Sequence, residues 1–100
     1  MKRGTTPTHT FTIPFDVSMI KTAKVIYSQS GKVIFDKCGD DLKLSENTIQ
    51  VKLNQEDTLS LDCKDSVSIQ VRVLTVGGDA LASDIMLVPV SRCLDDEVLV

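Results

Sequence analysis

The sequence predicts an all-β domain, and three observations predict it. Apolar and polar residues alternate with a period of two through most of the chain, as they do in half-buried strands. Turn-forming residues recur at short intervals between these segments. No segment shows a sustained helical period of 3.6 residues. About seven short antiparallel strands in 100 residues predict an immunoglobulin-like β-sandwich, with a small β-barrel as the alternative.

The chain of 100 residues is long enough for one domain with one modest core. We expect residues 1–7, which are polar and contain Pro7, to form a flexible arm. Residues 8–94 then form the single β-sandwich domain, and residues 95–100 form an acidic and apolar tail. The Cys–Trp–Cys core of antibody domains is missing, because the chain has no Trp.

The first predicted strand runs from His9 to Phe15. Its aromatic and aliphatic residues alternate with threonines, and Pro14 suits an edge strand or a strand end because it lacks a backbone donor. His9, the only histidine, is predicted to be a solvated residue at the start of the strand. The segment 16–20 is then a connection with room for one helical turn.

Residues 22–28 and 32–36 predict a hairpin with a three-residue loop at 29–31. In this register the apolar pairs and the charged pair agree, which is typical of a foldable sequence. The predicted cross-strand pairs are Val25 with Phe35, Tyr27 with Val33, and Lys24 with Asp36.

The middle of the chain predicts two further strands, one short at 42–44 and one at 49–53. Residues 39–41 and 45–47 are rich in Gly, Asp, Asn and Ser, and we expect them to be turns. The segment 54–57 is predicted to be a corner or a single turn of helix.

The segment 67–90 predicts a second hairpin with a three-residue loop at 77–79. A two-residue loop would place a carboxylate on the apolar face, since a one-residue slip inverts every side chain. The register therefore predicts three pairs: Val71 with Ile85, Ile69 with Leu87, and Arg72 with Asp84.

The same registers place apolar side chains on the outer faces of both hairpins, because side chains alternate along a strand. The candidate interface residues are Ile26, Ile34, Leu74, Met86 and Val88. The first two are expected to lie directly opposite each other. A contiguous exposed apolar patch marks an interaction surface, so these residues predict the docking of a second subunit. The alternative is that the arm or the tail covers them.

The charge distribution and the cysteines argue against several classes of ligand. Net charge is −3 and no basic stripe is present, so nucleic acid is not an expected partner. Cys38, Cys63 and Cys93 are widely spaced without a CxxC motif, which predicts free thiols in a reducing compartment and no zinc site. The acidic clusters lack the spacing of a calcium loop. We expect no metal and no cofactor.

Catalysis and membrane insertion are also not expected. Nucleophilic catalysis needs a base beside the nucleophile, and the single histidine lies near the arm. The carboxylates are explained by turns, so no catalytic pair and no enzymatic activity are predicted. The basic start, Met1 to Gly4, is not followed by an apolar segment of a secretory signal, and no run is long enough to cross a membrane.

Three segments carry a resemblance to a known group of proteins: PTHTFTIPFD, TIQVKLNQEDTLSL and VSIQVRVLTVGGDALASDIMLVPVSRCLDDEVL. Together they resemble small proteins encoded in phage and prophage structural-gene clusters of Gram-positive bacteria. More loosely, they are similar to the N-terminal β-sandwich domain of phage baseplate upper proteins. The shared features are structural: a Phe-rich first strand, a Gln-Glu-Asp-Thr corner, a Gln-Val-Arg strand and a Gly-Gly turn.

The resemblance implies a non-enzymatic structural or accessory protein of a virion, at the baseplate or tail. It implies other virion proteins as partners, with a homo-oligomer as a further option, and synthesis in the cytoplasm of the bacterial host. The alternative from a different class is a carbohydrate- or ligand-binding module. Exposed aromatic side chains would favour that alternative, and an apolar outer patch would favour assembly.

Overall fold

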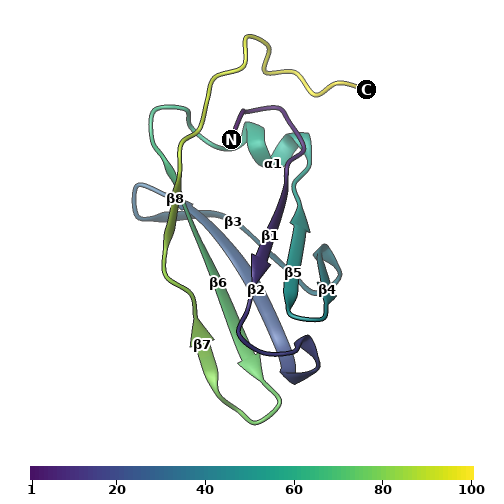
Figure 1. Ribbon diagram of the computed structural model, residues 1–100. Coiled ribbons are helices and arrows are strands. Elements are labelled where there is room, and N and C mark those ends of the chain that lie inside the picture. The colour runs from purple at the N-terminus through teal and green to yellow at the C-terminus, as the bar shows by residue number, and fades with distance from the viewer.

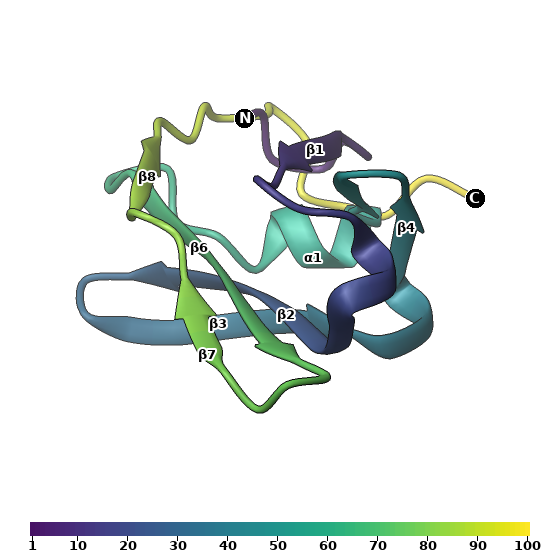
Figure 2. The same cartoon turned by 60° about the horizontal axis from the view of Figure 1, so that its bottom comes forward.

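The computed structural model describes residues 1–100 as two antiparallel sheets packed face to face (Figures 1 and 2). The smaller sheet has the strand order β1 (Thr8–Thr12), β5 (Thr48–Lys52), β4 (Leu42–Ser45). The larger sheet has the order β3 (Lys32–Cys38), β2 (Ile20–Gln29), β6 (Val67–Thr75), after which β7 (Ala80–Ala82) and β8 (Met86–Val88) both pair with β6. The predicted immunoglobulin-like β-sandwich is confirmed, with eight strands.

The core lies between the two sheets and comes from the alternating residues of β2, β5 and β6. Every second residue of β6, from Val67 to Thr75, is buried, and the residues between them are half-buried or exposed. One continuous cluster contains 13 buried side chains from both sheets. The largest that are fully buried are Tyr27, Ile49, Leu53 and Leu61. The period-two patterns therefore identified the buried faces of these strands.

Three short helices join the strands, each where turn residues predicted a change of direction. They are η1 (Val17–Met19), η2 (Gly39–Asp41) and α1 (Gln55–Leu59). Asn54 begins α1 with a capping box, in which its side chain accepts from the Asp57 amide and the Asp57 carboxylate accepts from the Asn54 amide. This reciprocal pairing satisfies two free donors of the helix start and explains why the segment 54–57 turns here.

The predicted register of the first hairpin is wrong by two residues. The turn contains only Ser30 and Gly31, whose φ angles of 52° and 77° are both positive, as a type I′ turn requires. Tyr27 therefore lies opposite Phe35, and Lys24 lies opposite Cys38. A shift by two keeps each side chain on its face, so Lys24 and Asp36 still meet, diagonally, at 3.7 Å.

A β-bulge between Tyr27 and Ser28 changes the face of the first residues of β3, which lie nearest the turn. Val33, predicted to face the core opposite Tyr27, instead lies opposite Ser28 and is 54% exposed. The tight Ser-Gly turn matches the twist of the two strands, and this local preference decides the register over the apolar pairing that the sequence suggested.

The predicted register of the second hairpin is also wrong. The Thr75 amide donates to the Asp79 carbonyl at 2.9 Å, so the loop is Val76 to Gly78, and Arg72 faces Ala82 instead of Asp84. After Ala82 the pairing with β6 is interrupted. It resumes at β8 with the register shifted by one residue, so that Ile69 lies opposite Met86. The predicted inward residues Ile85 and Leu87 are consequently 61% and 70% exposed.

Ser83 is the physical cause of this second shift. Its amide donates to the Val71 carbonyl at 2.9 Å, and its hydroxyl accepts from the Val71 amide at 3.0 Å. The Ser83 hydroxyl thus replaces the backbone carbonyl that would otherwise accept from the Val71 amide. This interrupts the backbone pairing with β6 and separates β7 from β8. A register shift by an odd number of residues moves each side chain to the other face of the sheet. The predicted inward or outward orientation of every β8 residue is therefore wrong.

Residues 1–7, which the sequence predicts to be a flexible arm, are hydrogen-bonded to distant parts of the chain. The Met1 ammonium donates to the Pro89 carbonyl at 2.7 Å, and residues 1–3 pair in parallel with Ser91. The Leu53 amide donates to the Pro7 carbonyl at 2.9 Å. The first residues therefore belong to the sandwich.

The tail, residues 95–100, is exposed but tethered at two points. The Gln55 amide group bonds both the carbonyl and the amide of Leu99, at 3.0 and 2.7 Å, and Arg3 forms an ion pair of 2.8 Å with Asp96. The tail lies beside α1, at the end of the molecule opposite the β6–β7 turn (Figure 1).

Candidate functional site

The five candidate interface residues do not form one outer patch. Ile26 and Leu74 lie on the outer face of the larger sheet, as predicted. Ile26 faces Gln70 and Asp36 across its two neighbouring strands, so it does not lie opposite Ile34. Ile34, Met86 and Val88 instead pack against the core cluster, because the bulge in the first hairpin and the strand break at Ser83 change their faces.

The structure exposes a different set of apolar side chains, along the free edge of the larger sheet. We call residues 80–88 the β7–β8 edge; both of its strands pair only with β6. Leu81, Ile85 and Leu87 are 45%, 61% and 70% exposed. Sequence reasoning missed the exposure of Ile85 and Leu87, because these two residues follow the one-residue change of register at Ser83.

An apolar hollow of about 300 Å³ lies beside this edge, between the end of β1 and β7. Leu81 lies opposite the buried Val73, so it points toward the inner side of its sheet. The end of β1 and the residues that follow it, from Thr12 to Phe15, line the other side of the hollow, and Leu81 remains 45% exposed. The other apolar lining residues are Ile13, Pro14, Phe15, Val71 and Ala82. The edge and the hollow together form an apolar opening beside strands that pair on one side only.

A polar cluster lies inside the sandwich at the opposite side of the core. His9 Nδ1 and the Tyr27 hydroxyl are hydrogen-bonded at 2.7 Å, and the Tyr27 ring stacks on Phe35 with centroids 4.6 Å apart. Beside them, Lys37 and Asp57 form an ion pair of 2.8 Å whose side chains are only 16% and 14% exposed. This cluster joins β1, β2, β3 and α1 by polar contacts.

Burial controls the ionisation of His9 and Tyr27. Desolvation lowers the pKa of His9, and the positive charge of the N-terminus lowers it further. Desolvation raises the pKa of Tyr27 far above its usual value, and the Asp57 carboxylate adds to that shift. Both groups are therefore neutral at neutral pH, and their hydrogen bond is a structural link between the sheets.

The prediction that His9 is solvated is wrong, and its position in the sequence contained the correct signal. His9 shares the parity of Phe11 and Ile13, which are half-buried and buried. The period-two rule therefore placed it on the inner face with them.

We expect His9→Ala to destabilise the protein by about 1–3 kcal/mol, because the buried Tyr27 hydroxyl loses its partner. The stability of the wild type should also depend on pH. Because the pKa of His9 is lowered in the folded state, the unfolded chain binds a proton first as the pH falls through 6.5. The free energy of unfolding should then decrease as the pH falls from 6.5 to the pKa of His9 in the folded protein. Above pH 6.5 the ionisation of His9 should make no contribution to the pH dependence of stability.

Chemical denaturation at a series of pH values tests this prediction, with His9→Asn as the control that cannot titrate. The control should lose the slope below pH 6.5. Equal slopes in both proteins would contradict the assignment.

No group of three or more His, Cys, Asp or Glu side chains is arranged to hold a metal ion. Cys38, Cys63 and Cys93 are all unpaired thiols. No helix has the length and apolar character needed to cross a bilayer.

Comparison with known proteins adds little to this description. No protein-family model matches the chain, and no curated protein matches it. Among solved structures, the chain is similar to the V domain of amphioxus IgVJ-C2, with a TM-score of 0.34 and 12% identity. That match covers 89% of this chain and 95% of the other. The fold assignment therefore rests on the two sheets themselves.

Proposed function

We propose that this chain is a non-enzymatic protein-interaction module that acts as a structural or accessory subunit of a phage or prophage particle, at the baseplate or tail. The observation that supports an interaction role is the β7–β8 edge, where apolar side chains border unpaired strand backbone and an apolar hollow. An extended segment of another virion protein can add to such an edge through main-chain hydrogen bonds. The virion assignment is supported by the resemblance of the three segments described above.

The carbohydrate-binding alternative would need exposed aromatic side chains. Tyr27 is fully buried, and Phe11, Phe15 and Phe35 pack against the core. The four aromatic residues of the chain therefore do not supply a platform for stacking sugars.

The proposal predicts that Leu87→Lys leaves the fold intact and prevents incorporation into particles. Leu87 is 70% exposed, so the monomer loses little, whereas a partner that buries it loses about 1.5–3 kcal/mol, or at least about tenfold in binding. The chain would be co-expressed with the virion proteins encoded beside it, and particles separated on a density gradient would be probed for it.

Val33→Lys is the matched control, since Val33 is 54% exposed on the distant strand β3. We expect the control to incorporate as the wild type does. Absence of the wild-type chain from purified particles would contradict the proposal, and so would normal incorporation of Leu87→Lys.

A further inference from the structure

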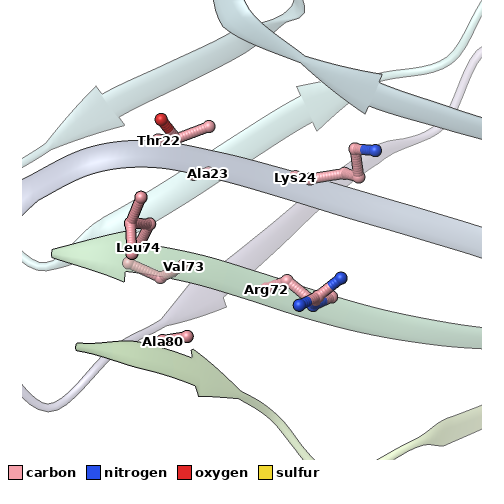
Figure 3. A pocket seen from close by; sticks show the side chains of 7 residues that line it. All are labelled: Thr22, Ala23, Lys24, Arg72, Val73, Leu74 and Ala80. Atoms are coloured by element: carbon pink, nitrogen blue, oxygen red, sulfur yellow. The ribbon is translucent and has the colours of Figure 1, made fainter. Parts of the chain in front are cut away.

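The outer face of the larger sheet contains two positive charges directly opposite each other. Lys24 on β2 and Arg72 on β6 are cross-strand partners (Figure 3). Like charges in this position destabilise a sheet. Lys24 is partly compensated by Asp36 at 3.7 Å, but Arg72 forms no ion pair, because the register places Ala82 on its other side. An acidic ligand would relieve this repulsion.

A shallow hollow of about 260 Å³ lies at these two side chains. Figure 3 shows its lining on three adjacent strands, with Thr22 from β2, Leu74 from β6 and Ala80 from β7. The hollow therefore combines a positive side with an apolar side. We call it the β2–β6 hollow. A matching ligand carries a carboxylate next to an aliphatic side chain.

The tail of this chain has that chemistry. Asp95 and Glu97 form no ion pair, and Leu99 is 73% exposed. Glu97 and Leu99 are two residues apart, as are Arg72 and Leu74. In extended backbone this separation is about 6.6 Å for both, so an extended tail aligns the carboxylate with Arg72 and the leucine with Leu74.

The tail cannot reach the hollow of its own molecule. Gln55 holds the backbone of Leu99 beside α1 and leaves its side chain exposed. Leu74 and Ala80 of the β2–β6 hollow flank the β6–β7 turn, which lies at the end of the molecule opposite α1 and the tail (Figure 1). The occupant must therefore come from another molecule.

We propose that the β2–β6 hollow binds the tail, residues 95–100, of a second copy of this chain, with the Glu97 carboxylate between Lys24 and Arg72 and the Leu99 side chain against Leu74. This inference rests on the proposed assembly function and specifies self-association as part of it. Because hollow and tail are different surfaces, the contact is head-to-tail and generates rings or filaments. The contact is smaller than a standard interface of about 1,200–2,000 Å², so association is weak and sensitive to salt.

Sedimentation velocity of the purified full chain, from micromolar to millimolar concentration, tests the proposal. The average mass of the wild type should rise with concentration and fall back on addition of salt. Arg72→Glu should remain monomeric, and it should stay folded because it creates an opposite-charge pair with Lys24. Lys43→Glu is the matched control, since it makes the same charge change at an exposed site on β4 and should associate like the wild type.

Mixing two variants tests the direction of the contact. Glu97→Lys alone should be monomeric, and a mixture of Arg72→Glu with Glu97→Lys should form a complex, because one chain supplies the intact tail and the other the intact hollow. A wild type that is monomeric at millimolar concentration would overturn the proposal, as would self-association of either variant at the wild-type level. Such a failure is distinguishable from failure of the proposed function, which is decided by incorporation of the wild type and Leu87→Lys into particles.

Discussion

Leu53→Ala should destabilise the protein by about 2–5 kcal/mol, because Leu53 is fully buried and its truncation leaves a cavity between the sheets. A domain of this size has only about 5–15 kcal/mol of stability, so the variant should lose a large share of it. Chemical denaturation followed by circular dichroism measures the change.

Leu87→Ala is the matched control for this prediction, because it makes the same chemical change at a side chain that is 70% exposed. We expect its effect to be within about 0.5 kcal/mol. Similar losses at the two positions would mean that the core does not lie where the structure places it.

Asp57→Asn should destabilise the protein by about 2–4 kcal/mol, a little less than the loss for breaking a fully buried pair. The substitution leaves the Lys37 ammonium without its partner in a site where it is only 16% exposed. Asp57 also accepts from the Asn54 amide in the capping box of α1, so the charge that it loses stabilises the helix start as well. The free energy of unfolding at neutral pH is the measurement.

Asp36→Asn provides the comparison. Its ion pair with Lys24 is longer, at 3.7 Å, and both side chains are more than 40% exposed, at 46% and 42%. Exposed pairs contribute about 0–1 kcal/mol, so this variant should be nearly as stable as the wild type. Equal effects of the two substitutions would show that burial does not distinguish the pairs.

The two charged pairs expected from the hairpins show which contacts a sequence pattern can predict and which it cannot. The sequence placed Lys24 with Asp36 and Arg72 with Asp84 as register markers. The first pair forms, although the register is wrong, because a shift of two residues keeps both charges on one face. The second does not form, because the register places Ala82 opposite Arg72. The same difference created the unpaired cation on which the proposed self-association depends.

The candidate surfaces were predictable to different degrees. Ile26 and Leu74 were placed correctly on the outer face, since the long central strands β2 and β6 alternate regularly around them. The β7–β8 edge was not, because Ile85 and Leu87 follow a break in the strand, and its cause is the hydrogen bond that the Ser83 hydroxyl accepts from the Val71 amide on β6. The alternation of apolar and polar residues does not predict such a contact between distant residues.

The sequence by itself determined the all-β class and the buried faces of β2, β5 and β6, and it predicted a corner or a single turn of helix at 54–57, where α1 begins. These features follow from alternation and capping, which are properties of neighbouring residues. Only the tertiary structure decided the registers, the link between His9 and Tyr27, and the packing of residues 1–7 against Pro89 and Ser91. Each of these depends on which distant groups meet, and that outcome is a competition between turn geometry, bulges and the hydrogen bonds of buried polar atoms.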